Sequence, residues 1–285
     1  MTFRLDRFLT LYFFGPLTRL FPSKKGVKIP ILMYHSISDE LETGHAYFWI
    51  NTSPARFAEH MKFLHTNNYR VISLSTAVDL ITGNVQPITG NLVVLTFDDG
   101  YLDFYTQAFP VLKERGFSAT VFLPTAYIDG SSRGLKGKQH LNWKEVKELQ
   151  AEGINFGSHT INHAQLFDLK REEIEYEIKN SRKIIEEKTG NLVDSFCYPN
   201  KFPEQDKAFI DLMKILLQES GYKNGLSARV GTRNSNFERY FLKRVPINSR
   251  DDFSFFKKKM ESAYDWVYFP QRIKKSLSGS YKLRA

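Results

Sequence analysis

The segment Leu92-Val93-Val94-Leu95-Thr96-Phe97 decides the fold, and Asp98-Asp99-Gly100 follows it directly. A short apolar run bounded by a turn predicts a buried strand. Successive side chains of a strand point to opposite faces, so the two adjacent carboxylates cannot do the same work if the strand geometry persists. Because the chain turns at Gly100, one carboxylate can bind a metal ion while its neighbour takes a proton from water.

Two histidines follow about sixty residues later, in His159-Thr160-Ile161-Asn162-His163. Histidines at positions i and i+4 share a face if the segment is locally helical. Together with one carboxylate they make three ligands and leave coordination positions open for water and substrate, as catalytic zinc requires. The sequence therefore predicts a hydrolytic metal site.

Short apolar runs alternate with longer amphipathic segments along the chain. We expect strands at 29–34, 71–74, 92–97, 118–123, 154–157 and 194–198, and helices at 54–67, 75–80, 106–115, 143–152 and 171–188. This alternation predicts βαβ units and a parallel sheet, either a barrel or an open doubly wound sheet. In both folds functional side chains gather at the carboxyl ends of strands, where Asp98, His159 and the end of 196–198 would meet.

Composition indicates a folded protein. The chain has 285 residues, of which 42% are hydrophobic and 25% charged. A chain of this length can bury roughly 75% of its unfolded surface, and we expect one main domain. The composition excludes a disordered chain and a protein with many membrane spans. The single cysteine, Cys197, cannot form an intramolecular disulfide.

The net charge of +9 predicts either an anionic partner or a solvated basic face. Basic residues cluster only towards the C-terminus, at Lys257, Lys258, Lys259, Arg272, Lys274, Lys275, Lys282 and Arg284. Near the N-terminus, Arg4 and Arg7 precede an apolar run over 8–17 that is too short to span a membrane. Two interpretations remain open, an anchor that lies in the membrane interface and a helix packed on the domain.

The motifs described above resemble those of the polysaccharide deacetylases, the carbohydrate esterases of family 4 with a NodB homology domain. The family motif TFDDG is intact at 96–100, and the motif His-Ser/Thr-x-x-His is intact at 159–163. Tyr34-His35 after an apolar strand and Phe196-Cys197-Tyr198-Pro199 look like the branch that deacetylates poly-N-acetylglucosamine. The resemblance covers about residues 29–250 and implies an α/β fold, a distorted or incomplete (β/α) barrel.

The resemblance also implies roles for individual residues. Asp98 corresponds to the general base, and Asp99, His159 and His163 correspond to the ligands of a divalent metal, which would be Zn²⁺, with Co²⁺ or Ni²⁺ as alternatives. His35 corresponds to the catalytic acid, since no histidine follows His163.

The third family motif, at Phe196-Cys197-Tyr198-Pro199, departs from the family pattern in this chain. Asn200 would offer a backbone N–H to the oxyanion. Cys197 stands where the family often has an arginine, and Arg244 could replace that cation. Tyr34, Trp143 and Tyr198 are candidate substrate-binding residues, as is Arg244, although an aromatic residue that begins a helix is more often part of a core.

We therefore expect a metal-dependent deacetylase that hydrolyses the acetamide of N-acetylhexosamine units in a polysaccharide or a lipid-linked glycan. The alternative is a catalytically silent glycan-binding module on the same fold. The expected organisation is a basic and apolar segment at 1–28, a deacetylase domain at 29–255 and a basic tail at 256–285. We expect a location in the cell envelope, contact with an anionic membrane surface, and no nucleic-acid partner because no nucleic-acid motif is present.

Overall fold

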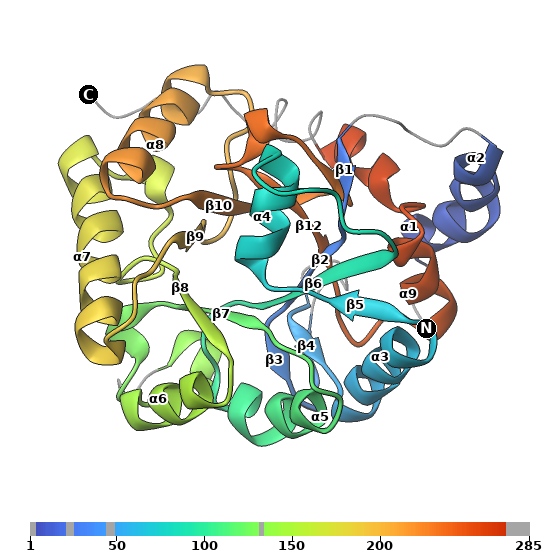
Figure 1. The fold of residues 1–285 in the computed structure, drawn as a ribbon, viewed down its shortest axis with the longest axis horizontal. Helices are drawn as coiled ribbons and strands as arrows, with labels where there is room; N and C mark the ends of the chain where they lie inside the picture. The colour runs from blue at the N-terminus through green and yellow to red at the C-terminus, as the bar shows by residue number, and fades with distance from the viewer. Residues whose placement is uncertain (1–3, 21–25, 44–48, 131–133, 272–285) are drawn as a thin grey trace.

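Seven parallel strands form a closed barrel in the computed structural model, which describes residues 4–20, 26–43, 49–130 and 134–271 (Figure 1). In spatial order the barrel strands are β2 (Ile31–Tyr34), β12 (Leu242–Pro246), β10 (Asn224–Val230), β9 (Ser195–Cys197), β8 (Asn155–Ser158), β7 (Thr120–Leu123) and β6 (Asn91–Phe97). The barrel closes because β2 pairs with both β12 and β6. The predicted (β/α) barrel is confirmed.

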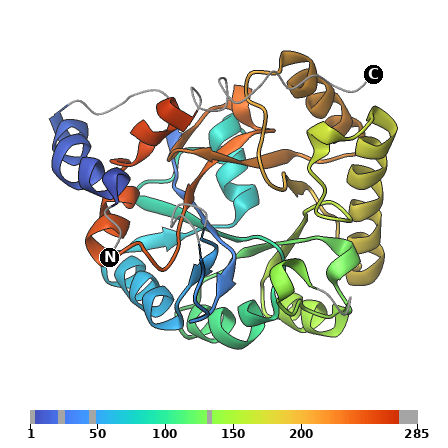
Figure 2. The ribbon, with the colours of Figure 1, turned by 180° about the vertical axis from the view of Figure 1, so that it is seen from behind.

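Helices surround this barrel, and short strands extend it (Figures 1 and 2). The larger helices are α3 (Pro54–Thr66), α5 (Phe109–Glu114), α6 (Trp143–Ala151), α7 (Arg171–Thr189), α8 (Lys207–Glu219) and α9 (Phe253–Met260). The short strand β5 (Tyr69–Val71) pairs with the start of β6, β3 (Ser36–Ile37) pairs with β4 (Asn51–Thr52), and β1 (Val27–Lys28) pairs with β11 (Arg233–Asn234). The residues predicted to form the site follow β2, β6, β8 and β9, so they lie on the carboxyl rim.

The barrel interior is apolar at one end and polar at the other. Helix α4 (Leu74–Thr82) packs its apolar face on inward-facing strand residues, and together they form one buried cluster. The strand members of this cluster include Ile31, Leu92, Val94, Phe122, Cys197, Leu226 and Leu242. Further along β6 and β12, the same alternation brings Thr96 and Asp98, two and four residues after Val94, and Arg244, two residues after Leu242, into the interior at the carboxyl end. All three are buried.

Local sequence signals set several helix ends. Ser53 caps α3 by accepting a hydrogen bond from the Arg56 N–H, and Asn142 forms a capping box with Glu145 at the start of α6. Gly190, with φ 75°, ends α7 in the left-handed conformation that glycine adopts without strain. These three helices lie where the sequence predicts them.

Two other elements differ from the prediction. The strand expected at 71–74 is β5, three residues at 69–71, because Ser73 caps α4 and starts that helix at Leu74. The helix expected at 106–115 begins earlier, with a π-helical turn η3 (Phe104–Ala108) before α5. With this wider turn, the chain is helical from shortly after Gly100 to Glu114.

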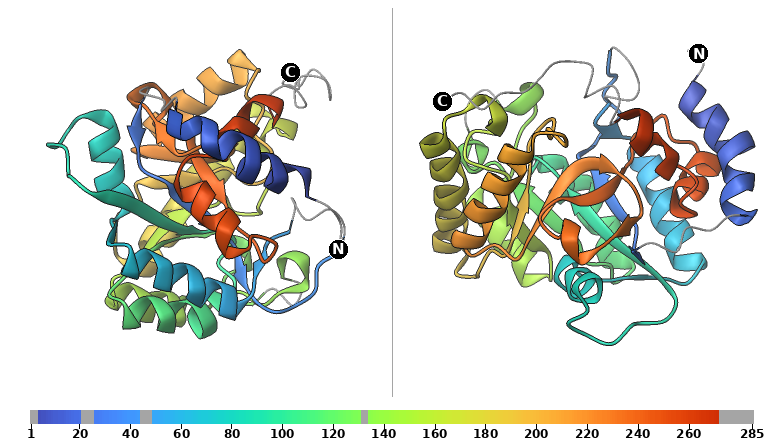
Figure 3. Two further views of the ribbon diagram at one scale, coloured as in Figure 1. Left: turned by 90° about the vertical axis from the view of Figure 1, so that its right-hand side faces the viewer. Right: turned by 90° about the horizontal axis from the view of Figure 1, so that it is seen from above.

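The N-terminal segment packs on the domain in three short helices, α1 (Leu5–Leu9), η1 (Thr10–Phe14) and α2 (Gly15–Leu20) (Figure 3). Arg4 pairs with the buried Asp251, and the Phe14 and Trp266 rings stack with centroids 4.6 Å apart. The packed helix is thus the interpretation that the structure supports. No helix among residues 4–20, 26–43, 49–130 and 134–271 is long and apolar enough to cross a membrane.

The expected basic tail at 256–285 is packed against the domain as far as residue 271. Phe256 lies in the main core, and Lys259 is fully buried, with its ammonium 2.7 Å from the Asp251 carboxylate. The remaining basic residues of the predicted cluster, Arg272, Lys274, Lys275, Lys282 and Arg284, lie outside the described residues.

Candidate active site

A buried ion pair between Asp98 and Arg244 lies at the polar end of the barrel. Asp98 follows β6, Arg244 belongs to β12, and β2 separates the two strands. The two terminal nitrogens of Arg244 donate to the two carboxylate oxygens of Asp98, each at 2.7 Å. Arg244 also donates to the Ser227 carbonyl and lies 3.2 Å from the Cys197 sulfur. The cation that the third family motif lacks is therefore supplied from another strand.

Arg244 keeps Asp98 ionised. Burial alone would raise the pKa of the Asp98 carboxyl, but the charge and hydrogen bonds of Arg244 outweigh burial and lower that pKa below its ordinary value. Arg244 is 1% exposed and has no contact with solvent that a glycan could use. The structure thus places Arg244 behind the expected base and away from a substrate surface.

The three expected metal ligands converge beside this pair. The Asp99 Oδ1 atom lies 3.4 Å from Nε2 of His159 and 3.2 Å from Nε2 of His163. Two ligand atoms at tetrahedral angles around Zn²⁺, each about 2.0–2.1 Å from the ion, lie roughly 3.4 Å apart. The distances from Asp99 to the two histidine nitrogens therefore fit a tetrahedral zinc site, and all three ligand atoms lie within 4.8 Å of one another.

Hydrogen bonding shows that a cation is needed between His159 and Asp99. The His159 Nδ1 atom lies 2.8 Å from the Cys197 carbonyl oxygen, which can only accept, so Nδ1 carries a proton. In a neutral ring Nε2 would then direct a lone pair at the Asp99 carboxylate. Burial lowers the pKa of His159, but Cys197 and Asp99 outweigh burial and raise it well above its ordinary value. A proton or a metal ion resolves this contact.

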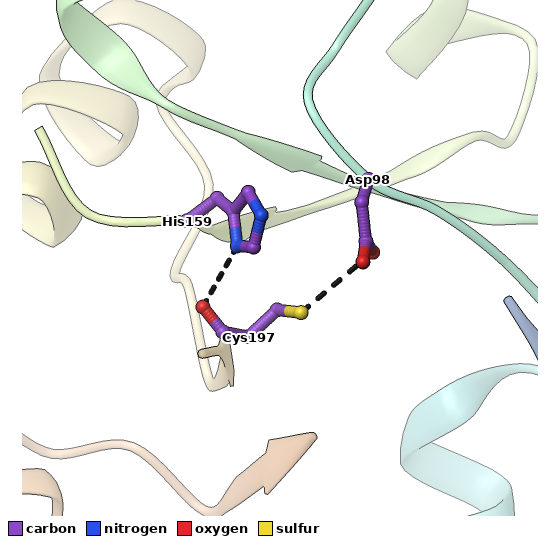
Figure 4. A group of neighbouring side chains, drawn as sticks. All are labelled: Asp98, His159 and Cys197. Atoms are coloured by element: carbon purple, nitrogen blue, oxygen red, sulfur yellow. Dashed lines mark hydrogen bonds between the residues drawn. The ribbon is translucent and has the colours of Figure 1, made fainter. Parts of the chain in front are cut away.

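A second group of ligand-type atoms consists of Asp98, His159 and Cys197 (Figure 4). The Cys197 sulfur lies 3.6 Å from Asp98 Oδ1, and burial raises the pKa of its thiol. The Arg244 guanidinium binds both oxygens of Asp98 and lies 3.2 Å from the Cys197 sulfur, so its positive charge opposes a metal ion in this group. Asp99, His159 and His163 are the better donor set.

Strained backbone shapes this part of the barrel rim. Asp99 has φ 73°, His163 has φ 54° and Asn200 has φ 59°, and Thr160 between the two histidines has φ 65°. Non-glycine residues in this region cost about 1–3 kcal/mol each and persist only where surrounding contacts enforce them. The left-handed turn at Asp99 is what separates its carboxylate from that of Asp98.

His35 lies on the other side of Asp98. Its Nε2 atom is 3.7 Å from Asp98 Oδ2, and its side chain is partly exposed. Burial lowers the pKa of His35, and Asp98 opposes that shift in part. The following residues are fixed by Asp103, whose carboxylate accepts hydrogen bonds from Ser36 Oγ at 2.5 Å and the Ile37 N–H at 3.0 Å. Asp103 thus holds the strand after His35 and does not contact a metal ligand.

Glu177 was not among the predicted site residues. Its carboxylate accepts hydrogen bonds from the N–H groups of Ile161 and Asn162, at 2.7 and 3.0 Å, and from the Asn162 side chain. It fixes the loop between the two histidines. A sequence signal exists, because Glu177 falls on the buried face of α7 beside Ile174 and Ile178, where a carboxylate needs a partner.

Asn200 lies at the rim, and its side-chain amide is 3.4 Å from the His163 carbonyl. The aromatic candidates are not at the surface. Tyr34 is fully buried, with its hydroxyl 3.1 Å from His60, and Tyr198 packs on Phe196, Phe202 and Phe241. Trp143 begins α6 within the core. These three side chains belong to the packing and leave little surface for a glycan.

The other histidines have packing or rim positions. His60 stacks on Phe256 inside the domain, His65 is exposed, and the ring of His140 lies against Tyr101 and Tyr127. His45 lies outside the described residues.

Comparison with known proteins shows the family of this chain. A family model described as polysaccharide deacetylase matches residues 86–214. YxkH of Bacillus subtilis (strain 168), which is named as a polysaccharide deacetylase, is 31% identical over 227 residues, covering 79% of this chain and 74% of YxkH. The chain belongs to the polysaccharide deacetylase family. The expected hydrolase class is thereby confirmed at the level of the family.

One further curated relative and one solved structure are informative. The poly-beta-1,6-N-acetyl-D-glucosamine N-deacetylase of Escherichia coli (strain K12) is 28% identical over 140 residues, which cover 46% of this chain and 20% of that protein. The structure of the Streptococcus pyogenes deacetylase PplD in complex with acetate matches with a TM-score of 0.70 and 24% identity, covering 83% of this chain and 99% of PplD. The latter likeness shows that the two proteins share a fold.

Metal binding is testable without an activity assay. We expect one equivalent of Zn²⁺ to raise the free energy of unfolding by about 2.7 kcal/mol when free zinc is 100 times its dissociation constant. Thermal unfolding with and without chelator measures this effect. Asp99→Asn and His163→Ala should abolish it because each removes a ligand.

The controls for metal binding are Asp98→Asn and Cys197→Ser, which should retain the zinc effect. Loss of the effect in these two variants, with retention in Asp99→Asn, would assign the metal to the group that contains Cys197.

Proposed function

We propose that this protein is a metal-dependent N-deacetylase of N-acetylhexosamine units in a glycan. The observation that carries the proposal is the order of groups across the rim: Asp99 with two histidines, then Asp98 held by Arg244, then His35. A base, an acid and a metal-type donor set within one site are what amide hydrolysis requires. The poly-beta-1,6-N-acetyl-D-glucosamine deacetylases among its relatives support the choice of substrate.

In this mechanism Asp98 accepts a proton from a water molecule, and the oxygen of that water attacks the acetamide carbonyl carbon. A divalent ion, when bound by Asp99, His159 and His163, supplies Lewis acidity, and Zn²⁺ fits these donors, with Co²⁺ and Ni²⁺ as alternatives. The Asn200 N–H, which has no hydrogen-bond partner among the described residues, is offered to the oxyanion. His35 then protonates the departing nitrogen, the C–N bond breaks, and acetate and a free amine are released.

Acetate release tests the proposal. The purified protein with Zn²⁺, Co²⁺ or Ni²⁺ should release acetate from N-acetylglucosamine oligomers, and chelation should stop the release. Asp98→Asn should lower the rate by about 10²–10⁴-fold, because it removes the general base and leaves the metal ligands in place. Lipid-linked N-acetylhexosamines belong in the same substrate panel.

A folded, metal-loaded protein that binds these glycans and releases no acetate would instead be a glycan-binding module. That alternative has less support, because the base, the acid and the three donor atoms are all present in one site.

The Asp98–Arg244 pair predicts a change in pH dependence. Arg244 lowers the pKa of Asp98, so the ionised base persists as pH falls through the ordinary carboxyl range. Arg244→Lys loses the paired hydrogen bonds, which should raise the Asp98 pKa and move the acidic limb of kcat/KM to higher pH. Arg244→Ala would leave a buried charge unpaired and cost about 3–5 kcal/mol of stability, so the lysine variant is the better probe.

Arg182→Lys, on α7, is the matched control because Arg182 pairs with Glu186 away from the site. An unchanged acidic limb in Arg244→Lys, with normal turnover, would remove Arg244 from the mechanism.

We also propose that the N-terminal segment rests against an anionic membrane surface of the cell envelope. Its contacts with the domain use one face, and the other exposes Leu5, Phe8, Tyr12, Phe13, Leu17 and Leu20. Exposed apolar side chains this close together are typical of an interfacial helix. We also propose the division of the chain into a basic and apolar segment at 1–28, a deacetylase domain at 29–255 and a basic tail at 256–285.

Vesicle binding tests the membrane proposal. The protein should co-sediment with vesicles that contain an anionic phospholipid, and more weakly at high salt. The triple change Phe8→Ser, Tyr12→Ser and Phe13→Ser should lower binding more than tenfold, since each buried aromatic side chain contributes about 1.5–3 kcal/mol. Leu192→Ser and Phe237→Ser change residues that are 85% and 95% exposed elsewhere, and they should have no effect. Equal losses in both sets would argue against a specific surface.

A further inference from the structure

A polar groove of about 470 Å³ adjoins the candidate active site, within the size range of small-ligand sites. One wall is formed by Ile37, Ser38, Asp39 and Glu40, and the other by Gly137, Lys138 and Gln139. Leu102, Asp103, Thr106 and Gln107 line it from the segment that follows the first motif, and Pro54 completes the lining. No role in the proposed mechanism accounts for this groove.

Both walls of the groove are held by hydrogen bonds close in the chain to residues of the candidate site. Ile37 lies two residues after His35, which is about 7 Å along an extended chain, and Asp103 fixes its N–H. On the other wall, the Leu102 N–H donates to the Gln139 carbonyl and the Leu141 N–H donates to the Gly100 carbonyl, each at 2.9 Å. An ion pair between Glu40 and Lys138 joins the two walls. The groove is therefore fixed beside the site, between the segment that follows His35 and the segment that follows Gly100.

The direction of the reaction decides what would occupy this groove. In amide hydrolysis the acyl carbon faces the base and the metal ligands, and the departing nitrogen faces the acid. The sugar ring remains attached to that nitrogen, so it lies on the side of His35. The next unit of a glycan chain would then extend towards Ile37 and Leu102.

The lining suits a hexosamine. Ser38, Thr106, Gln107 and Gln139 offer hydroxyl and amide groups for sugar hydroxyls, while the partly exposed Leu102 and Pro54 offer apolar contact for a ring face. Among the described residues that line the groove, the carboxylates of Asp39, Glu40 and Asp103 outnumber the ammonium of Lys138, which is already paired with Glu40. This charge disfavours phosphorylated or uronic acid units and favours a protonated amino sugar.

We propose that this groove is a subsite for the neighbouring sugar of the glycan, and that it prefers a unit whose amine is already free. The inference rests on the proposed deacetylase function and adds to it the direction of the chain and the kind of neighbour. An enzyme with such a subsite acts better on an oligomer than on a monosaccharide, and better next to a unit that has already been deacetylated.

Chain-length dependence of kcat/KM tests the subsite. The substrates are N-acetylglucosamine and its oligomers of two to five units, with p-nitrophenyl acetate as a substrate that cannot reach the groove. Thr106→Trp places a large ring in the groove, since Thr106 is exposed in its lining. We expect the wild type to prefer oligomers, the variant to lose that preference at least tenfold, and p-nitrophenyl acetate hydrolysis to remain unchanged. Thr106→Ser is the matched control and should retain the preference.

Charge preference is tested with oligomers that carry one free amine next to the acetylated unit. Asp39→Asn should lower their advantage over the fully acetylated oligomers by about two- to fivefold, the usual effect of one exposed charge pair. Glu187→Gln, an exposed carboxylate on α7, is the control for net charge and should leave the ratio unchanged. Fully deacetylated oligomers should inhibit the wild type competitively. They should inhibit the Thr106→Trp variant only weakly, because its groove is filled.

The outcomes separate the two proposals. Acetate release that is independent of chain length, in both the wild type and Thr106→Trp, would overturn the subsite and leave the deacetylase intact. A length preference that Asp39→Asn does not alter would retain the subsite and overturn its preference for a free amine. No acetate release from any glycan or ester, by folded and metal-loaded protein, would overturn the deacetylase itself.

Discussion

A carboxylate can stay ionised inside this barrel only because a guanidinium is buried against it. Asp98 and Arg244 are both almost fully buried, and each satisfies the hydrogen bonds of the other. Loss of one partner from such a pair costs about 3–5 kcal/mol, which is a large part of the stability of a typical domain. The small, uncharged side chain of Cys197 leaves room for Arg244 at this position. The ionised state of Asp98 thus depends on closure of the barrel, because closure places Arg244 against it.

The other residues of the site are held in place by neighbouring residues that are not themselves part of it. The left-handed turn at Asp99 points its carboxylate away from Asp98 and towards the two histidines. Glu177 holds the loop between those histidines by its backbone, and the Cys197 carbonyl fixes the tautomer of His159. Asp103 holds the strand that follows His35 by accepting a hydrogen bond from the Ile37 N–H. Packing and hydrogen bonds across several strands enforce a geometry that local preference would not produce.

Sequence reasoning predicted the features that short stretches encode. The buried strand before Asp98, the paired histidines and the caps of α3 and α6 all depend on neighbours within a few residues. It named Arg244 only through the family resemblance, as a replacement for a missing cation. Residue spacing alone could not pair it with Asp98, because Arg244 lies 146 positions away and only barrel closure brings the two together. The burial of Tyr34 and Tyr198, and that of Lys259 with Asp251, likewise depend on which elements pack together. The strands β10 and β12 lack a strong periodic signal of their own and were not predicted.

The position of β12 in the barrel also has a consequence for protein synthesis. The metal-type donors belong to the middle of the chain and leave the ribosome well before residues 242–246, which carry the arginine. Until that strand inserts beside β2, the barrel has an open edge and Asp98 lacks its counterion. A nascent chain therefore carries the donor atoms of Asp99, His159 and His163 while Asp98 still lacks the guanidinium that keeps it ionised. Completion of the fold and pairing of the proposed base thus become the same event, set by one of the last strands to be made.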